Sequence, residues 1–349
     1  MFSEKLVFQL GELFCGPGGL AWGATHAHVQ GAKVVHKWSS DYDKSTCLTY
    51  TRNICPDKPS SVICQDVRTL DFAKLPKINA FAFGFPCNDF SIVGEHKGLD
   101  GKYGGLYQYG VKVLHIFKPD WFIAENVGGI RSSNKGKAFK IILDALEDSG
   151  YRLCANLYKF EDYGIPQTRH RVIIVGIRNN LALEFKVPKP NFINAHVSSS
   201  KALMDIPDNV PNNEIGRDSA RVIERLKYIK PGMNAFNSPI PPELALHVKG
   251  AKLSNIYKRL DPELPAYTVT GSGGGGTRMY HWSENRSLSN RERARLQTFP
   301  DDYEFMGSIT EVRKQIGMAV PPVGAQIIVE AVLKTFMHSP YPSVPASLN

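Results

Sequence analysis

The residues best suited to chemistry in this chain of 349 residues lie in the segment Phe83–Ser91, whose sequence is FGFPCNDFS. The apolar, aromatic run before Pro86 predicts a buried strand that delivers Cys87 to its end. From there to Leu106 the chain is polar and carries five glycines. This order predicts a nucleophile on a rigid edge beneath a mobile lid. Cys87 could equally be a small buried thiol at a strand end without a catalytic role. The other motifs of the sequence have to distinguish these two interpretations.

Strand-like and helix-like segments alternate through the first half, which predicts an α/β domain with a mostly parallel sheet. The first strand is expected at Phe8–Phe14 and the next helix at Leu20–Val29, with the turn FCGPGG between them. Glycines at such a turn let the backbone approach a ligand closely. The turn is not GxGxxG, and Pro17 lacks a backbone N–H for a phosphate. The pattern therefore favours a cofactor without phosphate and disfavours a dinucleotide oxidoreductase.

Acidic residues follow the second and third expected strands. Asp41 and Tyr42 come after the strand at Lys33–Ser39, and Asp66 follows the strand at Ser61–Cys64. An acid at the end of strand two is where nucleotide-binding sheets hold ribose hydroxyls, and a neighbouring tyrosine can lie against adenine. Each feature alone is compatible with a polar strand end. Together with the glycine turn they predict an adenosine pocket.

Two further strand ends carry charged side chains. Glu125 closes an apolar strand that begins at Trp121, a place where burial can raise a carboxyl pKa enough for a proton donor near neutral pH. Arg169 and Arg171 precede the strand Val172–Ile177, and alternate strand positions point the same way. The arginines are expected to face a phosphate or a carbonyl-bearing base, although a solvated charged edge would look alike.

Composition restricts the class of protein. Six cysteines lie scattered without a CxxC or a His/Cys ligand spacing, which favours reduced thiols in a cytoplasm over a disulfide framework or a zinc site. The first residues are not signal-like, and no apolar run approaches the ~20 residues of a membrane span. The net charge of +9 suits a polyanionic partner but is a weak sign of nucleic acid. We expect no metal and no membrane contact.

The alternation of strands and helices stops near Lys186. Residues 186–283 are rich in Pro, Asn and Ser and hold thirteen Lys and Arg against eight Asp and Glu, as expected for a surface that meets phosphates. A short strand and a flexible loop are expected at 267–278, where Arg278 and the aromatic residues after it would supply base or phosphate contacts. A plain flexible loop is the alternative. Arg291–Leu296 predicts a basic helix capped by Ser289 or Asn290.

The motifs described above and those near the C-terminus, taken in their order along the chain, resemble the motif set of the DNA (cytosine-5) methyltransferases. The resemblance covers most of the chain outside the central variable segment. Asn88-Asp89 departs from the family, where Gln commonly follows Pro-Cys, and Gly317-Met318 replaces the usual Gly-Asn. We expect altered loop or cofactor affinity from these departures, with activity retained. The motifs that carry the resemblance are 14–19, Asp41-Tyr42, Asp66, Pro86-Cys87, Gly105-Leu106, Glu125-Asn126-Val127, 167–171, 291–300 and 315–321.

The resemblance implies a Rossmann-like fold that uses S-adenosyl-L-methionine and releases S-adenosyl-L-homocysteine, with a smaller irregular target-recognition domain. It implies a catalytic domain at 1–185, the recognition domain at 186–283, a bridging segment at 284–311 and a return to the catalytic domain at 312–349. Cys87 would be the nucleophile, and Glu125, Arg169 and Arg171 would grip the cytosine. The implied cofactor contacts are Phe14, Gly16, Pro17, Gly18, Gly19, Asp41, Tyr42, Asp66, Val67, Pro86, Leu106, Met318 and Ala319, and the implied DNA contacts are Ser91, Asn126, Thr268, Thr270 and Arg278.

The function expected from these features is methylation of cytosine C5 in a specific short sequence of double-stranded DNA. The protein is expected to be a cytoplasmic monomer and the modification half of a restriction–modification pair, with a separately encoded endonuclease as partner. Two alternatives stay open from the residues alone. One is a tRNA cytosine-5 methyltransferase on the same scaffold, and the other is a DNA-binding protein whose catalysis has decayed.

Overall fold

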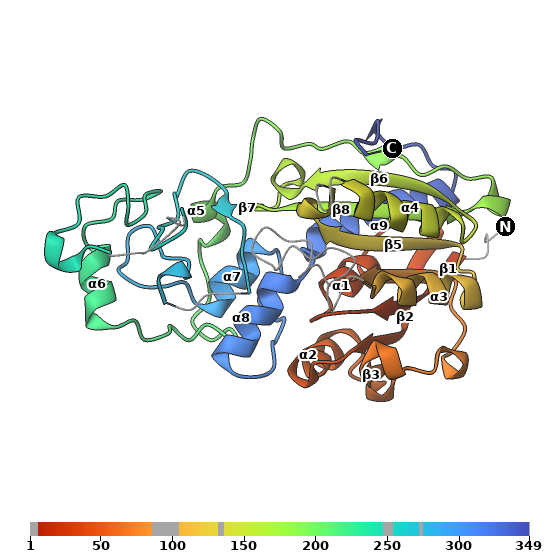
Figure 1. The fold of residues 1–349 in the computed structure, drawn as a ribbon, viewed down its shortest axis with the longest axis horizontal. Coiled ribbons are helices and arrows are strands. Elements are labelled where there is room, and N and C mark those ends of the chain that lie inside the picture. The colour runs from red at the N-terminus through yellow and green to blue at the C-terminus, as the bar shows by residue number, and fades with distance from the viewer. Residues whose placement is uncertain (1–5, 86–104, 132–135, 247–253, 272–274, 349) are drawn as a thin grey trace. The chain divides into compact units, whose positions relative to one another are not determined.

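The computed structural model describes residues 6–85, 105–131, 136–246, 254–271 and 275–348 (Figure 1). The chain divides into two compact units. Unit 1 comprises Met1–Lys159, His170–Pro190 and Pro322–Asn349, and unit 2 comprises Phe160–Arg169 and Asn191–Pro321. Unit 1 contains the large sheet, and unit 2 has little regular structure.

The sheet of unit 1 has seven strands in the order β3-β2-β1-β4-β5-β8-β6 (Figure 1). Neighbouring strands from β3 to β5 are parallel, whereas β8 runs antiparallel to both β5 and β6. The order reverses at β1, and such switch points hold ligands beyond the carboxyl ends of the strands. The predicted α/β fold with a mostly parallel sheet is confirmed. The strands are β1 (Leu6–Leu13), β2 (Ala32–Asp41), β3 (Val62–Cys64), β4 (Ala80–Gly84), β5 (Trp121–Val127), β6 (Tyr151–Lys159) and β8 (His170–Arg178).

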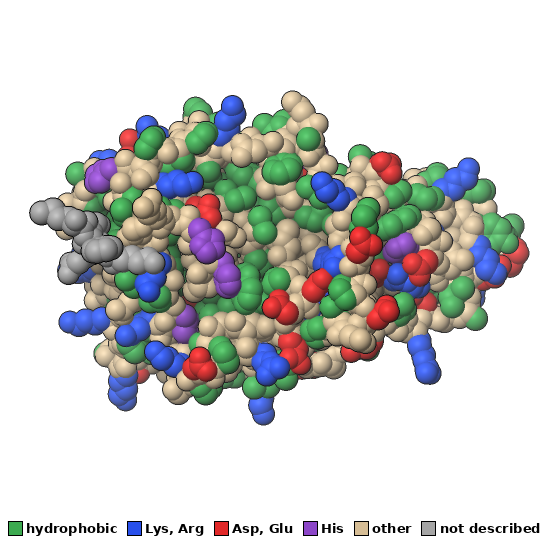
Figure 2. Space-filling model, turned by 180° about the vertical axis from the view of Figure 1, so that it is seen from behind, with side chains coloured by type: hydrophobic (Ala, Val, Ile, Leu, Met, Phe, Trp, Pro, Cys, Tyr) green, Lys and Arg blue, Asp and Glu red, His purple; other side chains and the backbone are tan. Residues whose placement is uncertain are grey.

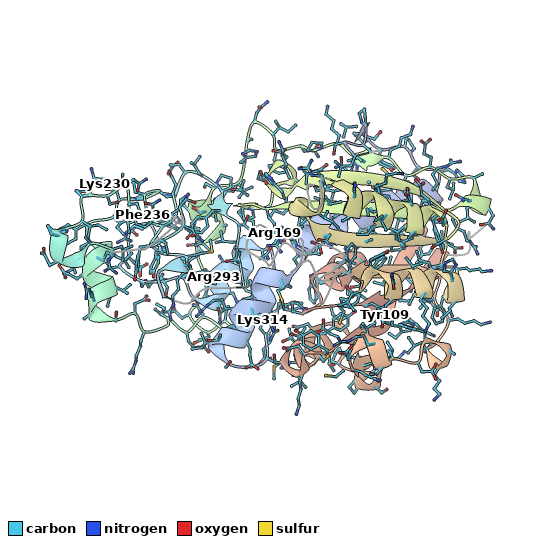
Figure 3. All side chains as sticks on the ribbon, in the orientation of Figure 1. Tyr109, Arg169, Lys230, Phe236, Arg293 and Lys314 are labelled. Atoms are coloured by element: carbon cyan, nitrogen blue, oxygen red, sulfur yellow. The ribbon has the colours of Figure 1, made fainter. Side chains whose placement is uncertain are left out.

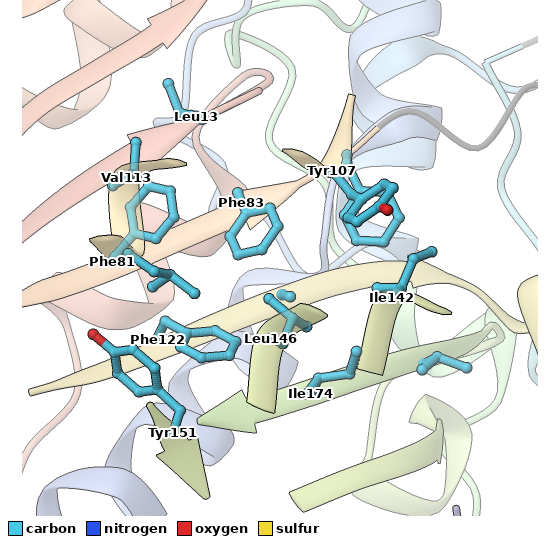
Figure 4. Packing of buried hydrophobic residues seen from close by; sticks show 14 of the residues in the cluster. Leu13, Phe81, Phe83, Tyr107, Val113, Phe122, Ile142, Leu146, Tyr151 and Ile174 are labelled. Atoms are coloured by element: carbon cyan, nitrogen blue, oxygen red, sulfur yellow. The ribbon is translucent and has the colours of Figure 1, made fainter. Parts of the chain in front are cut away.

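Alternating side chains of the strands pack against helices on the two faces of the sheet. On one face, Phe81 and Phe83 of β4 stack with ring centroids 5.1 Å apart and join a core with the buried residues of α3 and α4 (Figure 4). On the other face, Phe8 of β1 lies edge-on to Phe336 of α9. Burial of both apolar faces makes the sheet a rigid base for the loops at its edge. The helices are α1 (Gly19–Thr25), α2 (Lys44–Ile54), α3 (Tyr107–Phe117), α4 (Lys137–Glu147) and α9 (Pro322–Phe336).

Unit 2 is built from short elements around a small apolar cluster in which Tyr257 stacks on Tyr280. Unit 2 also buries a second aromatic group, Phe299, Tyr303 and Phe305, whose ring centroids lie 4.7–5.2 Å apart, and buried polar side chains add to its tertiary contacts. Two further short strands, β9 (Val187–Pro188) and β11 (Ser343–Val344), pair in unit 1. The elements of unit 2 are β7 (Gln167–Thr168), α5 (Ser199–Ala202), α6 (Ala220–Leu226), β10 (Ala266–Tyr267), α7 (Asn290–Leu296) and α8 (Ile309–Met318).

This division of the chain differs from the expected domain boundaries. The segment 160–169 leaves the sheet between β6 and β8 and joins unit 2, where β7 pairs with β10. Both α7 and α8 also lie in unit 2, so the chain returns to unit 1 at Pro322 and not at 312. Strand–helix alternation does not reveal the excursion at 160–169, because a two-residue strand has no periodicity to detect.

The stretch Ile309–Phe336, which comprises α8, a short break and α9, is long and apolar enough to cross a membrane. Its most apolar window is 72% buried inside the protein, which is the pattern of a core helix in a soluble protein. Among the described residues it is the one stretch that meets both criteria.

Candidate active site

The turn after β1 has the backbone conformation that its glycines permit. Phe14, Gly16 and Gly18 all have positive φ, and Gly18 caps α1. The N–H of Gly16 donates to Oδ2 of Asp41 over 3.0 Å, which ties the turn to the end of β2. A Cβ placed on Gly16 would meet nothing within 4 Å. The turn is therefore fixed by Asp41 on one side and has open space at the Cβ position of Gly16.

Asp41 and Tyr42 differ sharply in their surroundings. Oδ1 of Asp41 accepts from the N–H of Asp43, so both carboxylate oxygens hold backbone groups. Burial raises the pKa of the Asp41 carboxyl. The side chain of Tyr42 is 66% exposed and is free of the core. Asp41 is thus held by the backbone of the turn, while the ring of Tyr42 is open to solvent.

At the end of β3, Asp66 forms a two-pronged ion pair with Arg68. The next residue, Val67, is buried in the core of unit 1, and Leu106 packs against the same core. The side chain of Val67 is therefore largely engaged by the core, and the cofactor contact predicted for this residue stays a prediction. Parallel pairing brings the ends of β1, β2 and β3 to one edge of the sheet, as the sequence predicted.

Glu125 and Arg171 form a half-buried ion pair at the same sheet. Nε of Arg171 lies 3.0 Å from Oε1 of Glu125, and each side chain is 13% exposed. The register explains the contact, because Arg171 lies opposite Val127, two residues beyond Glu125, in the antiparallel β5–β8 pair. On its other side Glu125 lies next to Gly84, whose added Cβ would come within 3.2 Å of Oε2. A side chain on residue 84 would crowd the carboxylate.

Asn126, predicted as a DNA contact, is engaged by the backbone of its own chain. It is 3% exposed, its amide nitrogen donates to the carbonyl of Phe85, and its amide oxygen accepts from the N–H of Val127. Asn126 therefore fixes the chain directly before Pro86 and Cys87. Pro86, Cys87 and Ser91 themselves lie outside the described residues.

Arg169, labelled in Figure 3, lies in surroundings that do not favour the base contact predicted for it. It is fully buried in unit 2, and its guanidinium donates to the carbonyls of Val269, Gly317 and Ala319. A group surrounded by backbone carbonyls is not placed to meet a base. Arg169 and Arg171 were expected to point the same way, yet Arg171 belongs to β8 of unit 1.

Two glutamines that the sequence left without a role complete this arrangement. Nε2 of Gln167 donates to Leu296 O and to Oε1 of Gln297, while its Oε1 accepts from the N–H of Val269. Nε2 of Gln297 donates to the carbonyl of Ile316. Together with Arg169, these two glutamines connect β7, residue 269, α7 and α8 by buried hydrogen bonds. Full burial of a glutamine is the signal of such a role, and burial is not visible in sequence.

The other residues of unit 2 that were predicted to contact DNA or the cofactor differ in how exposed their side chains are. Arg278 pairs with the buried Asp218 at 3.0 Å, and Asp218 also accepts from the N–H of Ser287. This ion pair engages Arg278 within unit 2, and the base or phosphate contact predicted for it stays a prediction. Thr268 donates to the carbonyl of Thr168, and Thr270 is exposed. Met318 is exposed at the end of α8, whereas Ala319 is buried.

Comparison with known proteins decides the family. The model of the C-5 cytosine-specific DNA methylases matches residues 8–334. The chain belongs to this family. It is 57% identical to the Type II methyltransferase M.BbvI of Brevibacillus brevis, over 97% of this chain and 94% of that protein. It is 39% identical to M.NgoFVII of Neisseria gonorrhoeae, over 93% of this chain and 86% of that protein. The predicted family and enzyme class, a DNA (cytosine-5-)-methyltransferase, are confirmed.

A solved structure supports the fold of this methylase. A putative DNA modification methyltransferase encoded within an E. coli prophage matches it with a TM-score of 0.72 at 22% identity. The match covers 95% of this chain and 99% of that one. At this identity the likeness concerns the fold alone.

The surface charge of the methylase does not by itself mark a DNA face. Figure 2 shows Lys and Arg side chains scattered among Asp and Glu across the face in view. Arg278 and Arg286, both within the basic part of unit 2 or next to it, are engaged by Asp218 and by Glu284 and Glu292. Net positive charge therefore overstates the number of cations available to phosphates.

Replacing Gly317 by alanine should destabilise unit 2 of the methylase. The added Cβ would lie 1.9 Å from the nitrogen of Gly271 and 2.2 Å from the carbonyl carbon of Thr270. Because both are backbone atoms, relief requires α8 to shift, and such overpacking typically costs about 1–3 kcal/mol or more. Urea denaturation measures the loss. Gly216→Ala in the same unit is the matched control, since its Cβ would meet nothing within 4 Å. Equal unfolding midpoints for the two variants would contradict this packing.

The stability of the methylase should fall with rising pH because of Glu12 on β1. This buried carboxyl accepts from the hydroxyl of Tyr50 over 3.0 Å, and burial raises its pKa from 4.5 to about 8. Between these values the folded chain keeps a proton that the unfolded chain releases, so folding weakens by at most about 1.4 kcal/mol per pH unit. Glu12→Gln should remove this slope. Urea titrations at pH 5 and pH 8 would refute the assignment if wild type and variant changed in parallel.

Proposed function

We propose that this methylase transfers a methyl group from S-adenosylmethionine to C5 of a flipped-out cytosine in a short, specific duplex DNA sequence. The observation that carries the proposal is the Glu125–Arg171 pair beside Gly84. Cys87 follows Gly84 by three residues, so chain connectivity keeps their Cα atoms within about 11 Å. The proposal therefore puts the Cys87 nucleophile and the paired carboxylate at the same end of the sheet.

The turn after β1 fits a cofactor that carries adenosine. The space above Gly16 is open, the ring of Tyr42 is exposed, and Asp66 stands at the end of the next strand. Phe14, Gly16, Gly18 and Tyr42 would border the cofactor, and Asp41 would hold the turn beneath it. When bound, S-adenosylmethionine supplies an electrophilic methyl sulfonium.

The residues of the chain address a chemical difficulty, because C5 of cytosine is a poor nucleophile. Addition of the Cys87 thiolate to C6 makes the ring an enamine that is nucleophilic at C5, and a few per cent of a free thiol is ionised at neutral pH. The addition places negative charge on the ring, which a hydrogen bond from Glu125 at N3 relieves. Loss of the C5 proton after methylation expels Cys87 by β-elimination.

Arg171 is the natural partner of Glu125 in this scheme. Its Nε lies 3.0 Å from one carboxylate oxygen, which would leave the other for the base, and its guanidinium would meet the carbonyl of cytosine. The target base reaches these groups only outside the stacked duplex, at a cost of roughly a few kcal/mol. Arg169 and Asn126 serve as positioning residues.

Duplex DNA in a restriction–modification system is the substrate that the relatives favour, since two of them are named Type II methyltransferases. We therefore propose that the methylase protects a recognition sequence from a separately encoded endonuclease. No feature of the described residues favours tRNA over DNA.

Base-resolution mapping of methylation on a plasmid tests the proposal, in cells that express either the wild type or Cys87→Ala. We expect 5-methylcytosine in one short sequence with the wild type and none with the variant. A covalent complex with DNA that contains 5-fluorocytosine, absent with Cys87→Ala, tests the adduct separately. An unmethylated plasmid from folded protein would refute DNA as the substrate, and methylation of tRNA under the same conditions would name the alternative.

A further inference from the structure

Two thiols meet below the strand end that carries Asp41 and Tyr42. The thiol of Cys47, on α2, donates to the carbonyl of Asp41 over 3.4 Å. The thiol of Cys64, at the end of β3, donates to the carbonyl of Tyr42 over 3.9 Å. The register agrees, because Cys64 is the partner of Asp41 in the parallel β2–β3 pair and α2 contacts β3. Two cysteines far apart in sequence thus share consecutive carbonyls of one strand end.

The two thiols differ in access. Cys64 is exposed, whereas Cys47 is buried, and both are free thiols. Burial raises the pKa of the Cys47 thiol, and its hydrogen bond with the Cys64 side chain raises it further. An oxidant from solvent therefore meets Cys64 first, and Cys47 is the protonated thiol that lies next to it.

We propose that Cys64 is an oxidative modification site and that Cys47 is its resolving thiol, so that a hydroperoxide converts the pair into a disulfide at the edge of the cofactor site. Neither cysteine takes part in the proposed methyl transfer. The inference about the cofactor rests on the proposed function, whereas disulfide formation does not.

The reaction balances with the hydroperoxide as oxidant. With hydrogen peroxide as the hydroperoxide, the Cys64 thiolate attacks one peroxide oxygen, the O–O bond breaks, and a sulfenic acid forms. The hydroxide that leaves takes up the proton that the Cys64 thiol had released and departs as water. The sulfur of Cys47 then attacks the sulfur of the sulfenic acid, the S–O bond breaks, and a second water carries away the thiol proton. Two electrons pass from the two thiols to the peroxide. The second step should be the slower one and should accelerate with pH, because Cys47 is seldom ionised.

Disulfide formation should weaken cofactor binding. The S–S bond of about 2.05 Å requires the two sulfurs to leave their carbonyl partners and draws α2 toward β3. The carbonyls they leave belong to Asp41 and Tyr42, and Asp41 holds the turn at Gly16. We expect affinity for S-adenosylhomocysteine to fall at least about tenfold, which corresponds to about 1.4 kcal/mol.

Peptide mapping under non-reducing conditions tests the disulfide. The full-length Cys87→Ala protein is treated with hydrogen peroxide, alkylated and digested, which removes the expected nucleophile as a competing thiol. We expect a linked pair of peptides that contain Cys47 and Cys64, absent in a further Cys64→Ser variant and retained in a further Cys15→Ser variant. Linkage of Cys64 to Cys15, or a Cys64 sulfinic acid beside a free Cys47, would overturn the proposal.

Calorimetry with S-adenosylhomocysteine tests the effect on the cofactor site. The reduced protein should bind, the oxidised protein should bind at least about tenfold more weakly, and dithiothreitol should restore the affinity. Peroxide should leave the affinity of the Cys64→Ser variant unchanged. Unaltered binding by the protein with the mapped disulfide would overturn the regulatory role. Failure of the reduced protein to bind would instead count against the proposed cofactor, with the disulfide still judged by mapping.

Discussion

Glu125→Gln is expected to lower kcat by about 10²–10⁴-fold, the usual contribution of a positioned proton donor. Glutamine has nearly the same shape, and its amide oxygen can still accept from Nε of Arg171, which now donates to Oε1 over 3.0 Å. The variant should therefore keep its fold and its affinity for S-adenosylhomocysteine. What it loses is the ability to pass a proton to N3 as Cys87 adds to C6.

Single-turnover methyl transfer to DNA and the rate of adduct formation with 5-fluorocytosine DNA measure this loss. Both rates should fall together, because the proton is needed at the addition step. Glu330→Gln on α9 is the control, since Glu330 makes comparable hydrogen bonds at a distance from the sheet edge, to Gln326 and His28. A slow methyl transfer with an unchanged rate of adduct formation would move Glu125 to a later step.

Arg169→Met is expected to destabilise unit 2 by about 3–5 kcal/mol, because it leaves the carbonyls of Val269, Gly317 and Ala319 without their donor inside the protein. The methionine fills much of the volume but donates no hydrogen bond. Without these hydrogen bonds, α8 should also separate from residues 269–271. The two backbones lie close together there because Gly317 has no side chain.

Arg171→Met is the matched comparison, with the same substitution two residues later. Its side chain is 13% exposed and paired with Glu125, so we expect a large fall in kcat and a loss of stability smaller than that of Arg169→Met, because water still reaches the carboxylate left behind. Chemical denaturation and kcat, measured on both variants, separate the two roles. If Arg169→Met kept the wild-type unfolding midpoint while losing activity, Arg169 would touch the base as the sequence predicted.

The arrangement of strands and helices in unit 1 can largely be predicted from the sequence. A glycine turn after an apolar strand, then an acid after each of the next two strands, predicted a ligand edge, and parallel pairing of β1, β2 and β3 brings these residues to one edge. Local signals sufficed because strand ends in a parallel sheet are placed by topology, and topology follows from the alternation of strands and helices. Glu125 was found for the same reason.

The roles of Asn126, Arg169 and Arg278 were decided by the tertiary structure. Each is a polar residue in a motif that also contains exposed groups, and sequence cannot tell which member of such a motif is buried. Arg169 meets carbonyls 100 or more residues away, and Arg278 meets Asp218 60 residues away. The sequence predicted the family, which the comparisons confirm, and the edge of the sheet at which the proposed chemistry would take place. Only the tertiary structure shows which polar side chains are buried and which are exposed. The free-energy cost of burying a polar group depends on hydrogen-bond partners that are distant in sequence, and no local sequence pattern records them.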